Sequence, residues 1–143
     1  MLDSVLTGGL RDNLVVARIK NIMFDCEHPA SLARFWAQAA DGYAVAPYDD
    51  AELARLREMG IDDPDDDPGV LVEPPSSDLP RLFFQKVPES KVAKNRVHLD
   101  LCADDVDAEA QRLIALGASE LHRHGSWITL LDPQGNEFCI DQE

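Results

Sequence analysis

Apolar and polar residues alternate along several short stretches of the chain, and such alternation is typical of β-strands with one buried face. Residues 94–102 give the clearest case, because His98, Asp100 and Cys102 alternate with two leucines. We predict a strand here, with a leucine side for a core and a polar side that carries an imidazole, a carboxylate and a thiol. This polar side is a candidate for chemistry; the alternative is that it simply meets water.

Three helices and seven further strands are predicted from patterns of the same kind. A helix is expected where apolar residues recur at three- and four-residue spacing, or where acidic residues open a stretch that glycine closes. The expected helices cover residues 28–41, 49–60 and 105–117. The remaining expected strands cover residues 14–24, 43–46, 70–72, 81–87, 119–124, 127–131 and 137–140.

The order strand, helix, strands occurs twice, which predicts two similar modules packed as one unit. Asn21 stands seven residues before the start of the first expected helix, and His98 stands seven before the start of the third. Each half ends on an alternating strand, one with Gln85 and the other with Cys139. We therefore expect these four residues to occupy equivalent strand ends and to converge on one cavity.

A length of 143 residues suits a single domain. We predict one domain over residues 1–143, with an N-terminal extension at 1–13, a first module at about 14–88 and a second at about 95–143. Three cysteines at irregular spacing are not the pattern of a disulfide framework, so a reducing cytoplasm is the expected location.

The chain is strongly acidic, with 27 acidic against 13 basic residues and a formal net charge of −14. A surface of this charge repels phosphate backbones and anionic lipids, so neither a nucleic acid nor a membrane is expected as a partner. The run of five aspartates at 62–67 places Asp63, Asp65 and Asp67 at calcium-loop spacing. Pro68 stands where such a loop needs glycine, which favours a solvated acidic loop over a calcium site.

Several motifs taken together resemble the vicinal oxygen chelate superfamily, in particular its glyoxalase-like branch, which includes bleomycin-resistance and dioxygenase proteins. The resemblance implies an α+β fold of two βαβββ modules whose curled mixed sheets form a cleft, in most cases within a homodimer. The motifs that carry it lie at residues 24–36, 84–89, 94–101 and 132–139, the last containing Asp-Pro-Gln-Gly-Asn.

Metal-dependent members of this superfamily place one ligand on the first and last strand of each module. Carried over, these positions are Asn21, Gln85, His98 and Cys139. A histidine with a cysteine favours Zn²⁺ over Mg²⁺ or Mn²⁺. The two amides are weak ligands, so the alternative is a cleft that binds no metal.

The resemblance leaves two classes of function open. The first is a small-molecule enzyme of lyase, isomerase or dioxygenase type, in which His98 beside Asp100 or Glu137 moves a proton. In that case Cys139 is either a nucleophile or an inert buried thiol.

The second class is a non-catalytic protein that binds or sequesters a small molecule, as bleomycin-resistance proteins do. Aromatic and sulfur side chains supply contact area in such a cleft, and a few polar groups orient the ligand. For this role we expect a ligand-binding set made of Met23, Phe83, Arg96, His122, His124 and Trp127.

Overall fold

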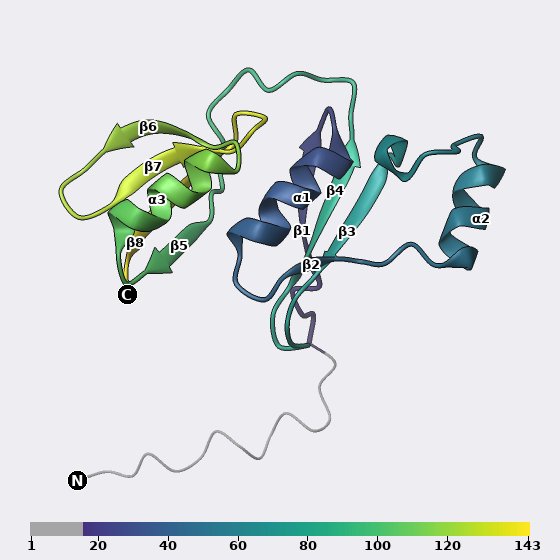
Figure 1. The fold of residues 1–143 in the computed structure, drawn as a ribbon, viewed down its shortest axis with the longest axis horizontal. Helices are drawn as coiled ribbons and strands as arrows, with labels where there is room; N and C mark the ends of the chain where they lie inside the picture. The colour runs from purple at the N-terminus through teal and green to yellow at the C-terminus, as the bar shows by residue number, and fades with distance from the viewer. Residues whose placement is uncertain (1–15) are drawn as a thin grey trace, which may run out of the picture.

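The computed structural model describes residues 16–143, and it contains two four-stranded mixed sheets with an α-helix packed on each (Figure 1). The expected N-terminal extension and the first residues of the first expected strand lie outside the described residues. Both sheets follow the order strand, helix, three strands, so the fold is α+β with two βαβββ modules, as predicted.

The first module carries two elements more than the second, both in the connection between its second and third strands. Its elements are β1 (Asn21–Cys26), α1 (Pro29–Ala39), β2 (Ala44–Val45), α2 (Asp50–Glu58), the 3₁₀ helix η1 (Pro64–Asp66), β3 (Gly69–Glu73) and β4 (Arg81–Lys86). The strands are ordered β1-β4-β3-β2, with β1 and β4 parallel and the other neighbours antiparallel. α2 lies at the far end of this module, beyond β3 (Figure 1).

The second module repeats this topology without an inserted helix. Its elements are β5 (Asp100–Ala103), α3 (Val106–Ala115), β6 (Ser119–Arg123), β7 (Ile128–Leu131) and β8 (Glu137–Gln142). The strands are ordered β5-β8-β7-β6, and β5 and β8 are the parallel pair. A long linker connects β4 to β5 and passes from one module to the other (Figure 1).

The helix ends follow from local chemistry. Pro29 opens α1, where a missing N–H costs nothing. The carboxylates of Asp49 and Asp105 cap α2 and α3 by accepting from backbone N–H groups three residues on, at 2.9 and 3.0 Å. Gly42 and Gly117, which follow α1 and α3, have φ angles of 74° and 121°. Glycine adopts these angles without strain, so the predicted helix stops are confirmed.

Alternation decides which face of each sheet is buried. Buried residues such as Phe84 on β4 and Phe138 on β8 pack with the helices into one core. We call the opposite face of each sheet its open face. On the first sheet the open face carries Asn21, Met23, Asp25, Leu71, Glu73, Arg81, Phe83 and Gln85; on the second it carries Asp100, Cys102, Thr129, Leu131, Glu137 and Cys139.

α1 joins the two modules, because it packs on its own sheet and also reaches the second one. The Trp36 ring lies 5.0 Å from the Phe138 ring, centroid to centroid. The Trp36 Nε1–H donates to Asp132 Oδ2 at 3.0 Å, and both residues are buried. From α3, the Arg112 guanidinium donates to the carbonyl oxygen of Gln38 at 2.9 Å. The modules are thus held by an aromatic contact and a small set of directed hydrogen bonds.

Three sequence predictions differ from the structure. Residues 16–20 precede β1 without regular structure, and Ile19 is 81% exposed there. β5 begins only at Asp100; before it, the Asn95 N–H donates to the Glu137 carboxylate at 3.0 Å, and the Leu99 carbonyl oxygen accepts from the Cys139 N–H at 3.0 Å. The 62–67 segment is not wholly solvated, since η1 ends by turning Asp67 into the interior, where it is 2% exposed.

None of the helices in the described part of the chain has both the length and the apolar character that a membrane span requires.

Candidate functional site

The open face of the second sheet carries a row of four chemically active side chains, one from each strand. Asp100 lies opposite Cys139, Cys139 lies opposite Thr129, and Thr129 lies opposite His122. Strand pairing places directly opposite Cβ atoms about 5 Å apart, so these groups are neighbours by construction. The row is the frame of the candidate site.

His98 joins this row at its β5 end. Its Nε2 lies 3.4 Å from Asp100 Oδ1, and one donor atom each from His98, Asp100 and Cys139 lie within 4.8 Å of one another. Among the described residues, this is the one group of three histidine, cysteine, aspartate or glutamate side chains close enough to share a metal ion. His98 and Cys139 were both predicted as metal ligands, and the structure brings these two together.

The row continues beyond Cys139 through hydroxyl and imidazole groups. Thr129 Oγ1 lies 3.4 Å from Cys139 Sγ and 3.1 Å from His124 Nε2. The His124 ring stacks on Trp127 with centroids 4.5 Å apart, and it meets the His122 ring edge-on at 4.3 Å. His122, His124 and Trp127, all named as ligand-binding residues, therefore form one aromatic cluster at the far end of the row.

Glu137, predicted as a catalytic carboxylate, lines the cavity that His98 also lines and is bonded to two residues of the linker. Its carboxylate accepts from Lys91 Nζ at 3.1 Å and from the Asn95 N–H at 3.0 Å. Burial alone raises the pKa of Glu137, but these hydrogen bonds and the nearby Lys91 charge outweigh it, and the pKa is lowered. Glu137 is thus a charged anchor that holds the linker against β8.

A cavity of about 850 Å³ lies between the modules, beside His98. Its walls come from β1, from the linker and from the turn before β8. Met23 and Arg96, both predicted to bind ligand, line this cavity together with His98. Its volume is in the range of small-molecule sites. Phe83, also predicted to bind ligand, lines a separate cavity on the first sheet.

The amide ligands predicted on the first sheet are not brought together. Asn21 lies opposite Arg81 and its Oδ1 accepts from Arg81 Nε at 2.9 Å. Gln85 lies opposite Asp25, four positions further along the same strand pair, and donates to that carboxylate at 2.7 Å. Four residues of strand span about 13 Å. The expected convergence of Asn21 with Gln85 is therefore wrong.

Strand register explains this error. Asn21 and His98 each stand eight residues before the first residue of their helix. Cys139 lies opposite Asp100, two residues after His98. The matching position on the first sheet lies opposite Met23 and is Phe83. Phe83, not Gln85, is therefore the equivalent of Cys139.

The roles of two polar residues, Thr129 and Asp132, were not predicted. Thr129 fell within an expected strand and Asp132 within the motif at 132–139, yet Asp132 is a buried carboxylate that accepts from four donors. These donors are the Trp36 indole, the backbone N–H groups of Gln134 and Asn136, and the Asn136 side-chain amide. The Asp-Pro-Gln-Gly-Asn motif signals the turn but not the indole, which comes from 96 positions earlier in the chain.

A family model described as a glyoxalase-like domain matches residues 21–140 of this chain. No curated protein matches the sequence.

Three solved structures share this fold at low identity. A glyoxalase/bleomycin resistance protein/dioxygenase family enzyme from Burkholderia phytofirmans PsJN is 16% identical, with a TM-score of 0.61 over 88% of this chain and 98% of that one. The trypanothione-dependent glyoxalase I of Leishmania major is 17% identical, with a TM-score of 0.57 over 90% and 88%. TnmS3, an antibiotic binding protein from Streptomyces sp. CB03234, is 18% identical, with a TM-score of 0.52 over 90% and 98%. These likenesses establish the fold, which enzymes and binding proteins share.

Proposed function

Because the chain belongs to the glyoxalase-like domain family, we propose that it is a small-molecule enzyme with His98, Asp100 and Cys139 at its reaction centre. The observation that carries the proposal is the convergence of these three side chains within 4.8 Å, beside a cavity of about 850 Å³ that His98 lines. A base, a carboxylate and a thiol at this spacing are the groups that acid–base and metal-assisted chemistry require.

Proton transfer is the first role we assign to His98. The imidazole lies at the cavity wall, and Asp100 is placed to accept from its Nε2–H and so to orient the ring. Histidine changes charge near neutral pH, so it can take a proton from a bound molecule and return it. The proposed substrate is a compact molecule with oxygen atoms on adjacent carbons, in line with the superfamily.

The donor set also fits a zinc ion. One nitrogen, one oxygen and one sulfur donor are the mixed ligands that Zn²⁺ accepts, and three protein ligands leave a position for substrate. Bound zinc would polarise an oxygen of the substrate. Asn21 and Gln85 are engaged with Arg81 and Asp25, so in this proposal the second module alone supplies the ligands.

The test combines metal analysis with turnover. Protein purified without a histidine tag is assayed for bound metal and for conversion of diols, hydroxyketones and catechols. We expect the native protein to turn over one of these compounds. His98→Ala should abolish this turnover and should also remove any zinc that is bound in stoichiometric amount. Cys139→Ser is expected to weaken zinc binding. Cys102→Ser should not, because Cys102 lies on the same open face but two residues beyond Asp100 on β5. Turnover that survives His98→Ala would refute the proposed centre.

The second candidate is a binding protein without catalysis. It is favoured by the engagement of Asn21 and Gln85 with neighbouring side chains, which leaves the first sheet without free ligands at the predicted positions. The fold of the antibiotic binding protein TnmS3 is compatible with this role. Ligand affinity that is unchanged in His98→Ala, without turnover of the ligand by the native protein, would select this candidate over the enzyme.

A further inference from the structure

A second cavity, of about 710 Å³, lies between α2 and the open face of the first sheet. It shares no lining residue with the cavity beside His98. One wall is the sheet, through residues such as Leu71 and Phe83, and the other is the connection that carries α2. Tyr48, Arg55 and Met59 line this second wall. The inserted helix therefore builds a pocket for which the second module has no counterpart.

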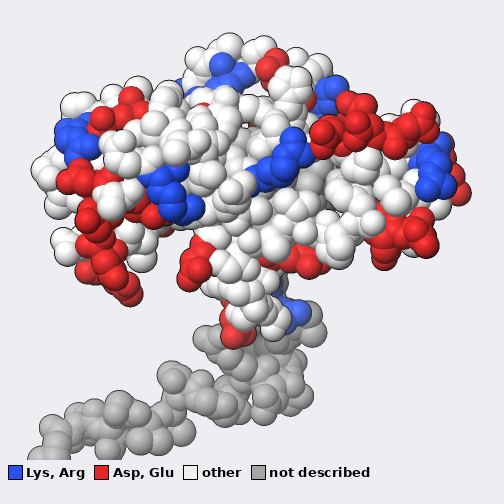
Figure 2. Space-filling view, viewed as in Figure 1, with Lys and Arg blue, Asp and Glu red and all other residues white. Residues whose placement is uncertain are grey.

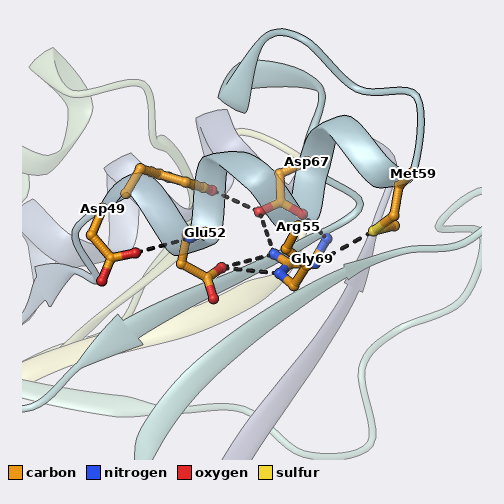
Figure 3. A network of polar contacts seen from close by, with 7 residues as sticks. Asp49, Glu52, Arg55, Met59, Asp67 and Gly69 are labelled. Atoms are coloured by element: carbon orange, nitrogen blue, oxygen red, sulfur yellow. Dashed lines mark hydrogen bonds and ion pairs between the residues drawn. The ribbon is translucent and has the colours of Figure 1, made fainter.

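The wall that holds α2 is a built structure and not a loose loop. The Asp67 carboxylate is buried, accepts from the Tyr48 hydroxyl at 2.8 Å and from the Gly69 N–H at 2.9 Å, and lies 3.6 Å from the Arg55 guanidinium. The pKa of Tyr48 is raised, mainly by burial and to a lesser extent by the hydrogen bond to Asp67. The hydroxyl therefore stays protonated and can donate. Figure 3 shows this network spanning α2 and the start of β3.

The charge of the lining is negative. It contains four carboxylates and a single guanidinium, a formal charge of −3. The guanidinium of Arg55 is already matched, because it donates to Glu52 Oε2 at 3.0 and 3.1 Å (Figure 3). Glu73, in contrast, makes no ion pair or side-chain hydrogen bond with any residue in the described range 16–143. Acidic side chains also gather over the α2 end of the molecule (Figure 2). An anion is therefore disfavoured.

The floor of the cavity is apolar and aromatic. Phe83 lies directly opposite Leu71, and its ring packs against Gly69, where a Cβ would stand 3.1 Å from Phe83 Cζ. The glycine thus makes room for the ring at the cavity wall. An aromatic face attracts an ammonium group, more strongly where water is partly excluded.

We propose that this cavity binds a cationic small molecule, an ammonium group carried on an apolar or aromatic body. The apolar body would rest on Leu71 and Met59, and the ammonium group would lie near Phe83 and the free carboxylate of Glu73. This site is independent of the reaction centre around His98, and it uses the helix that distinguishes the first module from the second.

The test is a nuclear magnetic resonance titration of ¹⁵N-labelled protein with benzyltrimethylammonium, a permanent cation on an aromatic body. Benzyl alcohol and phenylacetate serve as the neutral and anionic counterparts. We expect saturable shifts at Leu71, Phe83 and the residues of α2 for the cation, and at least tenfold weaker binding of the other two. Equal binding of the neutral compound, shifts centred on residues 95–99, or no saturable shift with the cation would overturn the proposal.

Variants separate specific binding from the general acidity of the chain. Glu73→Gln is expected to lower the affinity for the cation about fivefold, because a nearby charge is lost. Phe83→Leu is expected to lower it about tenfold, because the aromatic face is lost. Glu58→Gln removes one charge from α2 outside the cavity and should leave the affinity unchanged. Equal effects of Glu73→Gln and Glu58→Gln would contradict the proposed site. Because Glu73 is exposed, its variant retains the fold and keeps the test valid if Phe83→Leu unfolds.

Discussion

Asp132 is the residue on which contact between the modules depends most directly. Its buried carboxylate holds the turn before β8 and also accepts from the indole of Trp36 on α1. A buried carboxylate is tolerated only when its oxygens are well supplied with donors, and here four groups donate to them. One side chain thus shapes a turn and ties it to the other module.

We expect Asp132→Ala to lower the free energy of unfolding by about 3 kcal/mol, because it leaves one buried and three partly buried donors without an acceptor. Trp36→Phe should cost about 1–2 kcal/mol through loss of the indole donor. Urea denaturation measures both, and Asp104→Ala, at an exposed position, is the control. A change below 0.5 kcal/mol for Asp132→Ala, about the size of a surface substitution, would rule out this role.

The Cys26 thiol provides a prediction about pH. Burial raises its pKa from 9.0 to about 11, helped by the charges of Asp132 and Asp25. Below pH 9 the thiol is neutral in both the folded and the unfolded protein. Between pH 9 and pH 11 the thiol ionises only in the unfolded protein. The free energy of unfolding should therefore fall by about 2–3 kcal/mol over this range.

Urea denaturation at pH 8 and pH 10.5 tests this linkage. Cys26→Ala should show a smaller loss of stability between the two pH values than the native protein, whatever its stability at pH 8. Cys102→Ala, at an exposed cysteine, should behave like the native protein. The same pH dependence in all three proteins would show that Cys26 is not responsible.

At the scale of elements, α2 is the least conventional part of the fold. Only Leu56 among its residues is buried, so apolar packing holds it weakly. Arg55 attaches the helix to Asp67 (Figure 3), and Tyr48, which precedes the helix, donates to the same carboxylate. The position of the helix, and with it one wall of the second cavity, therefore rests on polar contacts.

We expect Asp67→Ala to destabilise the protein by about 2–3 kcal/mol, since it removes the buried acceptor of Tyr48 and Gly69. Asp65→Ala is the control, because Asp65 is exposed and only pairs with Arg34 at the surface; its cost should stay below about 0.5 kcal/mol. Urea denaturation measures the cost, and hydrogen exchange should show faster opening of α2 in Asp67→Ala alone. Equal protection of α2 in both variants would contradict this account.

At the scale of the whole molecule, α1 and α3 pack on one face of the sheets, and α2 lies across a cavity from only part of the open face of the first sheet. Met23 and Trp127, on the first and second module, are 47% and 40% exposed. Exposed aromatic and sulfur side chains on a sheet face are typical of surfaces that a partner covers. We propose that a second copy of the chain covers them, as expected from the superfamily.

Sedimentation velocity tests this proposal. The native protein should sediment at twice its mass of 15.8 kDa. Met23→Lys should shift it toward the monomer, because it places a charge on the covered face. Leu79→Lys, at an exposed leucine of the β3–β4 connector, should leave the dimer intact. A monomer at all concentrations, or a dimer that tolerates Met23→Lys, would exclude this interface.

Local patterns were sufficient for most of the elements. Alternation predicted β4 and β8, because side chains on a strand point to opposite faces in turn. The glycine that ends α3 and the aspartates that cap α2 and α3 were likewise readable, since their effects act within one helical turn. The predictions failed at 16–20 and 94–99, where backbone pairing with the neighbouring strand begins only at the last residue: Lys20 and Leu99 accept from the N–H groups of Arg81 and Cys139.

Local sequence patterns predicted the two modules and the alternating faces of their strands, and they made His98 a candidate for chemistry. The tertiary structure was needed to show that His98 and Asp100 lie near Cys139, whereas Asn21 and Gln85 lie apart from each other and are bonded to Arg81 and Asp25. It also decided that Glu137 anchors the linker and that Asp67 is buried. The reason is physical. A side chain's face depends on its own strand, whereas its neighbours depend on register and on contacts between distant segments, which local periodicity does not encode.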